Sequence, residues 1–442
     1  MPDTPEIADR HDAVCVVGAG ASGLAAIKNL REHGFAVDCY ERETSVGGAW
    51  NWRHDRSPVY AGAHLISSRP LTEFPDFPMP DDWPDYPHHS QVLSYLERYS
   101  AHFGLGEHIW FGTEVVSATP VGDGRWDVTT KSGGTQRYAA LVVANGHNWD
   151  PLKPDIPGEF RGRVMHAAEY KDPAVLRNRK VLVIGGGNTG CDLAVEAAQQ
   201  ATTVWHSTRR GYYYAPKYVF GRPADQVNAR LLRLRLPLRL RQWLYRRAVG
   251  LTVGDLTRFG LPAPDHKPYE SHPVVNSQLP YYLGHGRIRP VPDVKEFDGG
   301  SVELADGRRI EPDLVITATG YRPRFDFLAP ELLDAGPDGR PDLHLHAFAR
   351  KHPTLAVVGL LQPDAGLFPL AHWQSVAVAR WLRLRVEDPV RATAVQQKES
   401  TRPIRSWSRL AVVPTRRHWF EVDHVDYLRA IEGLLREMEP TA

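Results

Sequence analysis

The sequence contains one glycine spacing twice, and this repeat constrains the fold more than any other feature. Residues 18–23 read GAGASG and residues 185–190 read GGGNTG, so both copies have the form GxGxxG. Each copy follows an apolar run, at residues 13–17 and 180–184, and leads into a helical pattern. A strand that turns tightly into a helix places a pyrophosphate at the helix N-terminus, where free N–H groups favour negative charge. Two such fingerprints predict two bound dinucleotides; the alternative is one nucleotide and a second, purely structural glycine turn.

The residues after each fingerprint indicate which dinucleotide it binds. The strand predicted at residues 36–40 ends at Glu41, whose carboxylate suits ribose hydroxyls and repels a 2′-phosphate. The strand predicted at residues 203–206 runs instead into STRR, residues 207–210, without a carboxylate. Hydroxyl and guanidinium groups suit a 2′-phosphate, because arginine offers a fork of donors to phosphate oxygens. The first fingerprint therefore predicts FAD, and the second predicts NADPH.

The composition argues against several classes of function. The chain has 442 residues with 53 Lys plus Arg and 52 Asp plus Glu, and its net charge of +1 argues against nucleic acid as the main partner. The cysteines, Cys15, Cys39 and Cys191, form no Cys-x-x-Cys pair, which argues against a dithiol reductase and indicates reduced thiols. Histidines such as His88, His89 and His272 have no metal-ligand spacing, so we expect no metal site.

We expect a cytoplasmic protein without a membrane span. No stretch approaches the roughly 20 apolar residues that a span needs. The first strand is predicted to begin by residue 13, which leaves no room for a signal peptide.

The order of predicted elements indicates an α/β fold with two doubly wound Rossmann-like dinucleotide-binding domains. After each fingerprint comes a hairpin and then a buried strand that ends near glycine, with these last strands at residues 139–146 and 313–320. A strand at 355–359 and an amphipathic helix at 425–438 follow. We therefore expect the NADPH domain to be inserted in the FAD domain and joined to it by two hinge strands. The predicted ranges are 1–165 for the first part of the FAD-binding domain, 166–319 for the NADPH-binding domain, and 320–442 for the second part of the FAD-binding domain, with the C-terminal helix.

A motif between the fingerprints resembles one family. Residues 160–170 have the pattern Phe-x-Gly-x-x-x-His-x-x-x-aromatic, which resembles the signature of flavin-containing monooxygenases, the class B flavoprotein monooxygenases. Baeyer–Villiger relatives typically end the signature in tryptophan, where this chain has Tyr170. Further matching motifs lie in order along most of the chain, at residues 41–42, 47–50, 74–78, 145–148, 187–192, 272–276 and 318–321.

The resemblance implies a reaction in which NADPH reduces the flavin, O₂ adds at flavin C4a, and the hydroperoxide oxygenates nitrogen or sulfur of a small lipophilic substrate. Baeyer–Villiger oxygenation of ketones and an NADPH oxidase or reductase are the alternatives. With the fingerprints, it implies FAD-binding residues Gly18, Ala19, Gly20, Ala21, Ser22, Gly23, Glu41, Arg42, Gly48, Ala49, Trp50, Ile66, Ser67, Val115, Asn145, Gly146 and Gln362. It implies NADP-binding residues Gly185, Gly187, Asn188, Thr189, Gly190, Cys191, Asp192, Ser207, Thr208, Arg209, Arg210, Thr319 and Gly320.

One position departs from the family pattern. The family usually has an asparagine eight residues before Phe74, close to the flavin, and this chain has Ile66 there. Isoleucine offers no amide to the oxygenated flavin, and His64 or Ser67 are the possible substitutes. No catalytic acid or base is evident in the sequence, so Ile66 and Ser67 are the candidates beside the flavin.

Three further features have a structural and a functional interpretation. We expect His166 to bond a loop between the domains, and Cys191 to pack in the core despite its place at a helix start. Arginine and leucine alternate between Arg230 and Arg247, which suggests membrane-surface binding, but Pro237 would break a single helix there. We favour an insertion that packs over the active site or against the second subunit of a homodimer.

Overall fold

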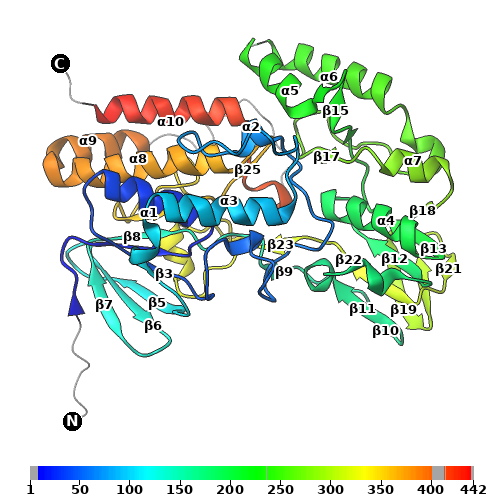
Figure 1. Ribbon diagram of the computed structural model, residues 1–442, viewed down its shortest axis with the longest axis horizontal. Helices are drawn as coiled ribbons and strands as arrows, with labels where there is room; N and C mark the ends of the chain where they lie inside the picture. Colours follow the sequence, from blue (N-terminus) through cyan, green and yellow to red (C-terminus); the bar gives the residue numbers. More distant parts are fainter. Residues whose placement is uncertain (1–7, 235, 401–412, 414, 440–442) are drawn as a thin grey trace.

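Two parallel sheets, each built around one fingerprint strand, organise the computed structural model, which describes residues 8–234, 236–400, 413 and 415–439 (Figure 1). Each fingerprint strand is apolar and buried at nearly every position, as a strand covered on both faces must be. The first sheet has the order β24 (Leu355–Val357), β8 (Ala140–Val143), β2 (Val14–Val17), β3 (Val37–Tyr40), β4 (Ile109–Trp110). The second has the order β11 (Arg163–His166), β22 (Leu314–Thr317), β12 (Lys180–Ile184), β13 (Thr203–Ser207), β18 (Ile288–Val291).

The predicted internal repeat is confirmed by the strand order. β2 and β12 hold the same central place, β3 and β13 lie on one side of them, and β8 and β22 lie on the other. Each half also has an antiparallel hairpin sheet with one short strand added in parallel at an edge. These sheets comprise β1 (Ala8–Asp9), β5 (Val115–Pro120), β6 (Trp126–Thr130) and β7 (Thr135–Tyr138), then β10 (Gly158–Phe160), β19 (Val294–Gly299), β20 (Ser301–Leu304) and β21 (Arg309–Ile310).

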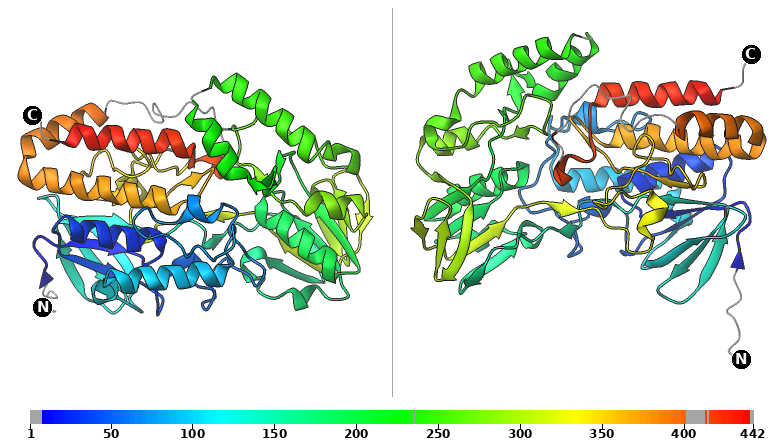
Figure 2. Two further views of the ribbon diagram at one scale, coloured as in Figure 1. Left: turned by 45° about the horizontal axis from the view of Figure 1, so that its top comes forward. Right: turned by 180° about the vertical axis from the view of Figure 1, so that it is seen from behind.

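Helices cover the sheets and enclose the cores. The largest core lies between the first sheet and its helices, with α8 (Phe368–Glu387) packed on α1 (Ala21–Glu32) and α10 (His424–Met438) packed on α8 (Figure 2). The C-terminal helix α10 (His424–Met438) is capped by Asp423, whose Oδ1 accepts hydrogen bonds from the backbone N–H groups of Val425 and Asp426, both at 3.0 Å. The α-helices packed around the two sheets are α1 (Ala21–Glu32), α3 (His89–His102), α4 (Asn188–Gln200), α7 (Leu279–Gly284), α8 (Phe368–Glu387), α9 (Pro389–Ser400) and α10 (His424–Met438).

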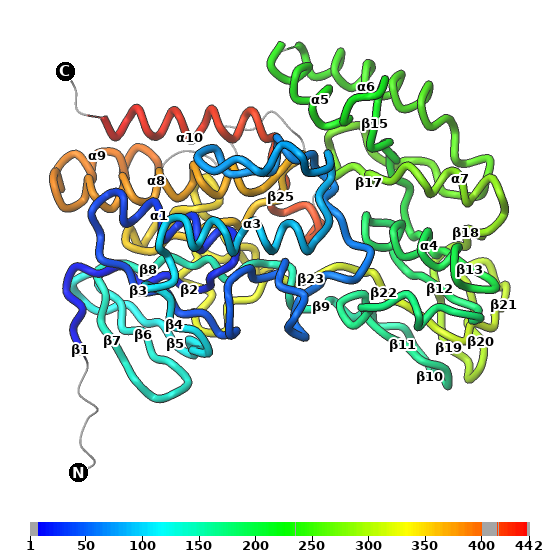
Figure 3. Tube along the Cα trace, in the orientation of Figure 1, coloured from blue at the N-terminus to red at the C-terminus, as the bar shows by residue number. Residues whose placement is uncertain are grey.

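The chain passes between the two halves along a pair of short strands. β9 (Asp150–Pro151) and β23 (Tyr321–Arg322) pair in antiparallel fashion and lie side by side at the junction (Figure 3). The residues from Gly158 to His166 already pair with strands of the second half, so a boundary at 165 would cut β11. We therefore propose that the first boundary lies near residue 151 and the second near 321. Residues 1–7, 401–412, 414 and 440–442 of the predicted ranges lie outside the described residues.

Residues 214–275, the insertion, extend from the second sheet towards the first half. The Arg–Leu stretch forms two helices rather than one, because Pro237 is the N-cap of the second; residue 235 is not described. The first of them lies against α10. The elements of the insertion are β14 (Tyr214–Ala215), β15 (Tyr218–Val219), β16 (Arg222–Pro223), α5 (Ala224–Arg233), α6 (Leu238–Thr252), η5 (Leu256–Phe259) and β17 (Val274–Val275).

Short elements complete the described chain. They are η1 (Gly48–Trp50), α2 (Arg69–Thr72), η2 (Leu105–His108), η3 (Ala167–Glu169), η4 (Pro173–Leu176), η6 (Pro330–Leu333), β25 (Gln362–Pro363), η7 (Arg416–His418) and β26 (Glu421–Val422). In the part of the chain that the structure describes, no helix combines the length and the apolar character that crossing a membrane requires.

Candidate functional site: two glycine turns at a junction

The two fingerprints share one backbone geometry. Gly18 has φ +101° and Gly185 has φ +133°, a region that residues with a side chain rarely adopt. A Cβ on Gly18 would lie 2.7 Å from the carbonyl oxygen of Ala144, and one on Gly185 would lie 2.3 Å from that of Ala318. The first glycine of each turn is therefore required both by conformation and by the neighbouring strand.

The last glycine of each turn lets the helix pack on the strand. A Cβ on Gly23 would lie 1.8 Å from the Gly18 carbonyl oxygen, and one on Gly190 would lie 1.9 Å from the Gly185 carbonyl oxygen. The N-caps Gly20 and Gly187 provide no side-chain cap to α1 and α4. Both helix N-termini therefore present backbone N–H groups, and the glycines leave room for a pyrophosphate.

Residues from distant motifs gather around the first turn. Gly48 lies against Gly20, since a Cβ on Gly48 would be 2.8 Å from the Gly20 Cα atom. The Cα atom of Asn145 lies 3.1 Å from the Cβ position of Gly18. Trp50, from the same motif as Gly48, packs against the core clusters of both halves. The structure thus brings together the predicted FAD residues of segments 18–23, 48–50 and 145–146.

Glu41 lies at the predicted place, beside the first turn. Its Oε2 accepts a hydrogen bond from the backbone N–H of Ala19 at 2.6 Å, and its Oε1 accepts one from that of Glu43 at 2.9 Å. Burial raises the pKa of this carboxyl, while the two backbone donors act in the opposite direction. A carboxylate has about four acceptor positions, so these two bonds leave capacity for ribose hydroxyls.

Other predicted FAD residues lie farther along the same half. Arg42 stacks over the ring of Trp149, with its Cζ 4.4 Å from the ring centroid. Val115 is buried in β5, and Gln362 begins β25.

The segment of Ile66 and Ser67 lies beneath the insertion. The Ser67 hydroxyl bonds that of Thr72 at 2.8 Å, and the backbone N–H of Ser68 donates to Asp225 Oδ2 at 2.5 Å. Asp225 belongs to α5, and burial raises the pKa of its carboxyl. Asp225 was not predicted from the sequence, because nothing in its local pattern indicates that α5 reaches the other half.

The residues after β13 match a 2′-phosphate site in part. The Thr208 hydroxyl is buried and has no hydrogen-bond partner among the described residues, so it can donate a hydrogen bond to a ligand oxygen. Arg209 is exposed and has no ion-pair partner in the described part of the chain. Arg210, in contrast, binds Asp265 through two hydrogen bonds of 2.7 and 3.2 Å and lowers the pKa of that carboxyl to about 2. The Ser207 hydroxyl donates to the Pro292 carbonyl oxygen at 2.8 Å.

Two predicted NADP residues, Asn188 and Asp192, have side-chain partners within the protein. Asn188 Oδ1 accepts a hydrogen bond from the Val275 backbone N–H at 2.7 Å. Asp192 accepts hydrogen bonds from Tyr60 Oη at 3.1 Å and from Asn276 Nδ2 at 2.6 Å, and burial raises the pKa of its carboxyl. These α4 side chains hold the β17 segment against the helix.

The remaining predicted residues near the second turn make packing contacts or hydrogen bonds within the protein. Cys191 is fully buried and burial raises the pKa of its thiol, so it packs in the core as expected. The Thr319 hydroxyl donates to the Leu152 carbonyl oxygen at 2.5 Å, beside the β9–β23 pair. His166 accepts a hydrogen bond from the Ala168 backbone N–H at 3.1 Å, and its ring lies 5.3 Å from that of Tyr321. This contact fits the expected structural role of His166.

A buried polar cluster joins the insertion to the segment before α10. Arg241 of α6 donates to Asp423 Oδ2 at 3.0 Å, with side-chain exposures of 7% and 1%. Burial and the neighbouring Asp423 carboxylate raise the pKa of Asp364 to about 7. Glu421 lies 3.5 Å from His272 Nδ1 and 3.1 Å from His418 Nδ1. The cluster connects the two halves beside β25.

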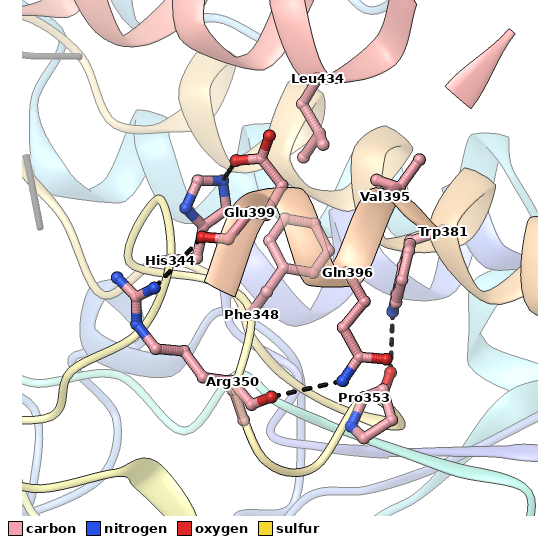
Figure 4. Close-up of a pocket in the computed structure, with 10 residues that line it drawn as sticks. His344, Phe348, Arg350, Pro353, Trp381, Val395, Gln396, Glu399 and Leu434 are labelled. Carbon is pink, nitrogen blue, oxygen red and sulfur yellow. Dashed lines mark hydrogen bonds and ion pairs between the residues drawn. The ribbon is translucent and has the colours of Figure 1, made fainter. Parts of the chain in front are cut away.

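Two cavities differ in their distance from the glycine turns. One of about 40 Å³ lies among α8, α9, α10 and the loop before β24, with the His344 ring bonded to Glu399 beside it (Figure 4). None of the predicted cofactor residues lines it. A larger one of about 180 Å³ lies between α6, η5 and Tyr212–Tyr214, next to the second turn. No group of three or more His, Cys, Asp or Glu residues is placed to hold a metal ion in the described ranges.

A family model and curated relatives both match most of the chain. The flavin-binding monooxygenase-like family matches residues 11–438. The chain is 33% identical over 391 residues to N-oxide-forming dimethylaniline monooxygenase 2 of Mus musculus, covering 83% of this chain and 72% of that protein.

Solved structures share the fold. S-allyl-L-cysteine S-oxygenase of Allium sativum has a TM-score of 0.65 at 23% identity, covering 97% of this chain and 89% of the other. Cyclohexanone monooxygenase of Rhodococcus sp. Phi1, bound to NADP⁺, has a TM-score of 0.70 at 20% identity, covering 98% of each chain.

The two fingerprint turns, the repeated sheets and the match over nearly the whole chain agree with one another, and FAD and NADPH are the cofactors of this family. The chain belongs to the flavin-binding monooxygenase-like family and is a flavin-dependent monooxygenase.

Proposed function

We propose that the protein is an NADPH- and O₂-dependent monooxygenase that oxygenates nitrogen or sulfur of small lipophilic substrates. The observation that carries the proposal is that two equivalent glycine turns have different partners, Glu41 beside the first and Thr208 with Arg209 beside the second. This difference supports FAD at the first turn and NADPH at the second. The N-oxide-forming relative and the S-oxygenase support nitrogen and sulfur as the acceptors.

The residues of the chain bind, orient and shield the reactants in this proposal. Bound FAD supplies the redox chemistry: electrons from NADPH reduce O₂, one oxygen atom goes to the substrate, and the other leaves as water. The backbone N–H groups at the starts of α1 and α4 bind the two pyrophosphates, and Glu41 orients the ribose of FAD. The insertion covers the segment of Ile66 through the bond between Asp225 and Ser68, which helps to exclude water.

The proposal is tested by giving the holoenzyme NADPH and ¹⁸O₂ with a tertiary amine, a sulfide and a ketone in parallel. We expect labelled N-oxide or sulfoxide and a matching consumption of NADPH. A labelled ester or lactone from the ketone alone would instead establish Baeyer–Villiger oxygenation, the reaction suggested by the fold shared with cyclohexanone monooxygenase. Hydrogen peroxide equal to the NADPH consumed, without an oxygenated product, would establish an oxidase.

Ile66 is the residue that favours the oxidase alternative, because it replaces an amide with an alkyl group. If Ile66 faces the flavin, the Ile66→Asn variant is expected to lower the ratio of peroxide released to NADPH consumed. Peroxide can be measured with a peroxidase-coupled dye and NADPH by absorbance. Ala61→Asn, which adds an amide at an exposed position of the same loop, is the control. An unchanged ratio in Ile66→Asn would place this segment away from the flavin.

Glu41 gives the sharpest test of FAD binding. The Glu41→Ala variant is expected to lose a charge-assisted hydrogen bond to the ribose, about 1.5–3 kcal/mol, and to bind FAD about ten-fold or more weakly. The readout is the ratio of flavin to protein after dialysis, followed by titration of the apoprotein with FAD. Glu107→Ala, an exposed carboxylate in η2, is the matched control. Full flavin occupancy in Glu41→Ala would assign the first turn to another ligand.

Two expectations about the whole protein belong with this proposal. We propose a cytoplasmic location and a homodimer, both from the sequence alone. Cell fractionation tests the location, and light scattering of the purified holoenzyme tests the oligomeric state.

A further inference from the structure

An arginine from the C-terminal segment lies over the second glycine turn. A Cβ on Gly187 would lie 3.1 Å from Arg417 Nη2 and 3.6 Å from both Nη1 and Cζ of the same side chain. Arg417 belongs to η7, which precedes β26 and therefore the part of the chain that returns to the first half. Figure 2 shows this red segment close to the green half of the molecule.

The segment is positioned by contacts with the insertion. The backbone N–H of Val413 donates to the Glu270 carbonyl oxygen at 2.9 Å, and Ser271 Oγ lies 3.3 Å from His418 Nε2. His418 is buried and anchors η7, whereas the neighbouring Arg417 side chain is exposed. Contacts of Val413, before Arg417 in the sequence, and of His418, after it, therefore hold Arg417 close to the turn.

The guanidinium group itself is fixed by Tyr212. Arg417 Nη1 donates to Tyr212 Oη at 2.8 Å, and its Cζ lies 4.9 Å from the centroid of the same ring. Tyr212 in turn contacts the turn, since a Cβ on Gly186 would lie 2.7 Å from Tyr212 Cε2. Arg417, Tyr212 and the second glycine turn therefore form one continuous surface.

A cation at this position is unfavourable without an anion. Gly187 is the N-cap of α4, and the N-terminus of a helix carries partial positive charge. No carboxylate of the described chain forms an ion pair with Arg417. Beside the same turn, the methyl group of Thr208 lies 3.3 Å from the Cβ position of Gly186, and its buried hydroxyl has no hydrogen-bond partner among the described residues. Two independent features therefore indicate an anionic ligand here.

We propose that Arg417 binds the pyrophosphate of the nicotinamide dinucleotide at the second turn. The inference deepens the proposed function and rests on it, because it takes that turn as the NADPH site. Arg417 then adds a full positive charge from the C-terminal segment to the partial positive charge of the α4 N-terminus, and the dinucleotide joins this segment to α4. The role differs from that of Arg209, because the pyrophosphate is common to NADPH and NADH whereas the 2′-phosphate is not.

The test measures equilibrium binding of NADP⁺ and NAD⁺ to the oxidised holoenzyme by isothermal titration calorimetry. In Arg417→Ala we expect the Kd of both nucleotides to rise by about ten-fold or more, since charge-assisted bonds to phosphate are lost. Arg417→Lys should recover part of the affinity, and Arg416→Ala, an exposed neighbour over Trp419, should bind both as the unmodified protein does. Flavin content and thermal unfolding without nucleotide show that each variant is folded.

The outcomes separate the two proposals. Unchanged Kd values for both nucleotides in Arg417→Ala would overturn the pyrophosphate assignment while leaving NADPH at the second turn. A rise for NADP⁺ alone would also overturn it and would assign Arg417 to the 2′-phosphate. Failure of the unmodified holoenzyme to bind either nucleotide would instead overturn the proposed function.

Discussion

Replacing Arg241 with methionine is expected to lower the free energy of unfolding by about 3–5 kcal/mol, because it leaves the buried Asp423 carboxylate without its cation. Asp364 makes the loss larger, since its raised pKa of about 7 already reflects burial and the proximity of Asp423. Without Arg241, two buried carboxyl groups lie together where β25 meets the start of α10. Urea unfolding followed by tryptophan fluorescence measures the effect.

Arg239→Met is the matched control, because Arg239 lies on the same helix and is exposed. We expect it to stay within about 0.5 kcal/mol of the unmodified protein. In Asp423→Asn the amide oxygen still accepts from the α10 backbone, so the double variant should be less destabilised than the sum of the two single changes. An Arg241→Met protein as stable as the control would mean that the insertion is not fixed to the first half through this pair.

The glycine turns and their strands were predictable because they depend on local pattern. The apolar run at 180–184 coincides with β12, and the helix predicted after the first fingerprint corresponds to α1. Glu41 was found for the same reason, as a polar residue at the end of an apolar strand. The repeated order of hairpin and buried strand then gave the correspondence of the two sheets.

The contacts across the junction could not be predicted in this way. Asp225, Arg241 and Arg417 each act on a segment far away in the chain, and which segment that is depends on how the insertion folds back. Family motifs do not reveal such contacts either. Asp192 belongs to a cofactor-binding motif, yet its carboxylate accepts hydrogen bonds from Tyr60 and Asn276. A motif identifies which residues recur together, whereas the partner of each side chain is fixed by tertiary packing.

Cofactor preference is the second large effect that we expect, and it depends on Arg209. This exposed guanidinium group follows the strand that ends beside the second turn, and the described chain offers it no carboxylate. A 2′-phosphate that it binds gains charge-assisted hydrogen bonds of about 1.5–3 kcal/mol each, so NADPH should be preferred over NADH by about ten-fold or more. In Arg209→Ala the KM for NADPH should rise by that factor, and the KM for NADH should stay nearly constant.

Steady-state kinetics with both cofactors tests this expectation. The kcat with NADPH should change little, because the lost contact is remote from the reacting atoms and is made equally in the ground and transition states. Arg210→Ala is the matched control: its guanidinium is bonded to Asp265, so removing it should affect the KM for NADPH far less. Equal efficiency with NADH and NADPH in the unmodified enzyme would contradict the assignment. Arg209 would then be an ordinary solvated charge, and the unpartnered hydroxyl of Thr208 would need another acceptor.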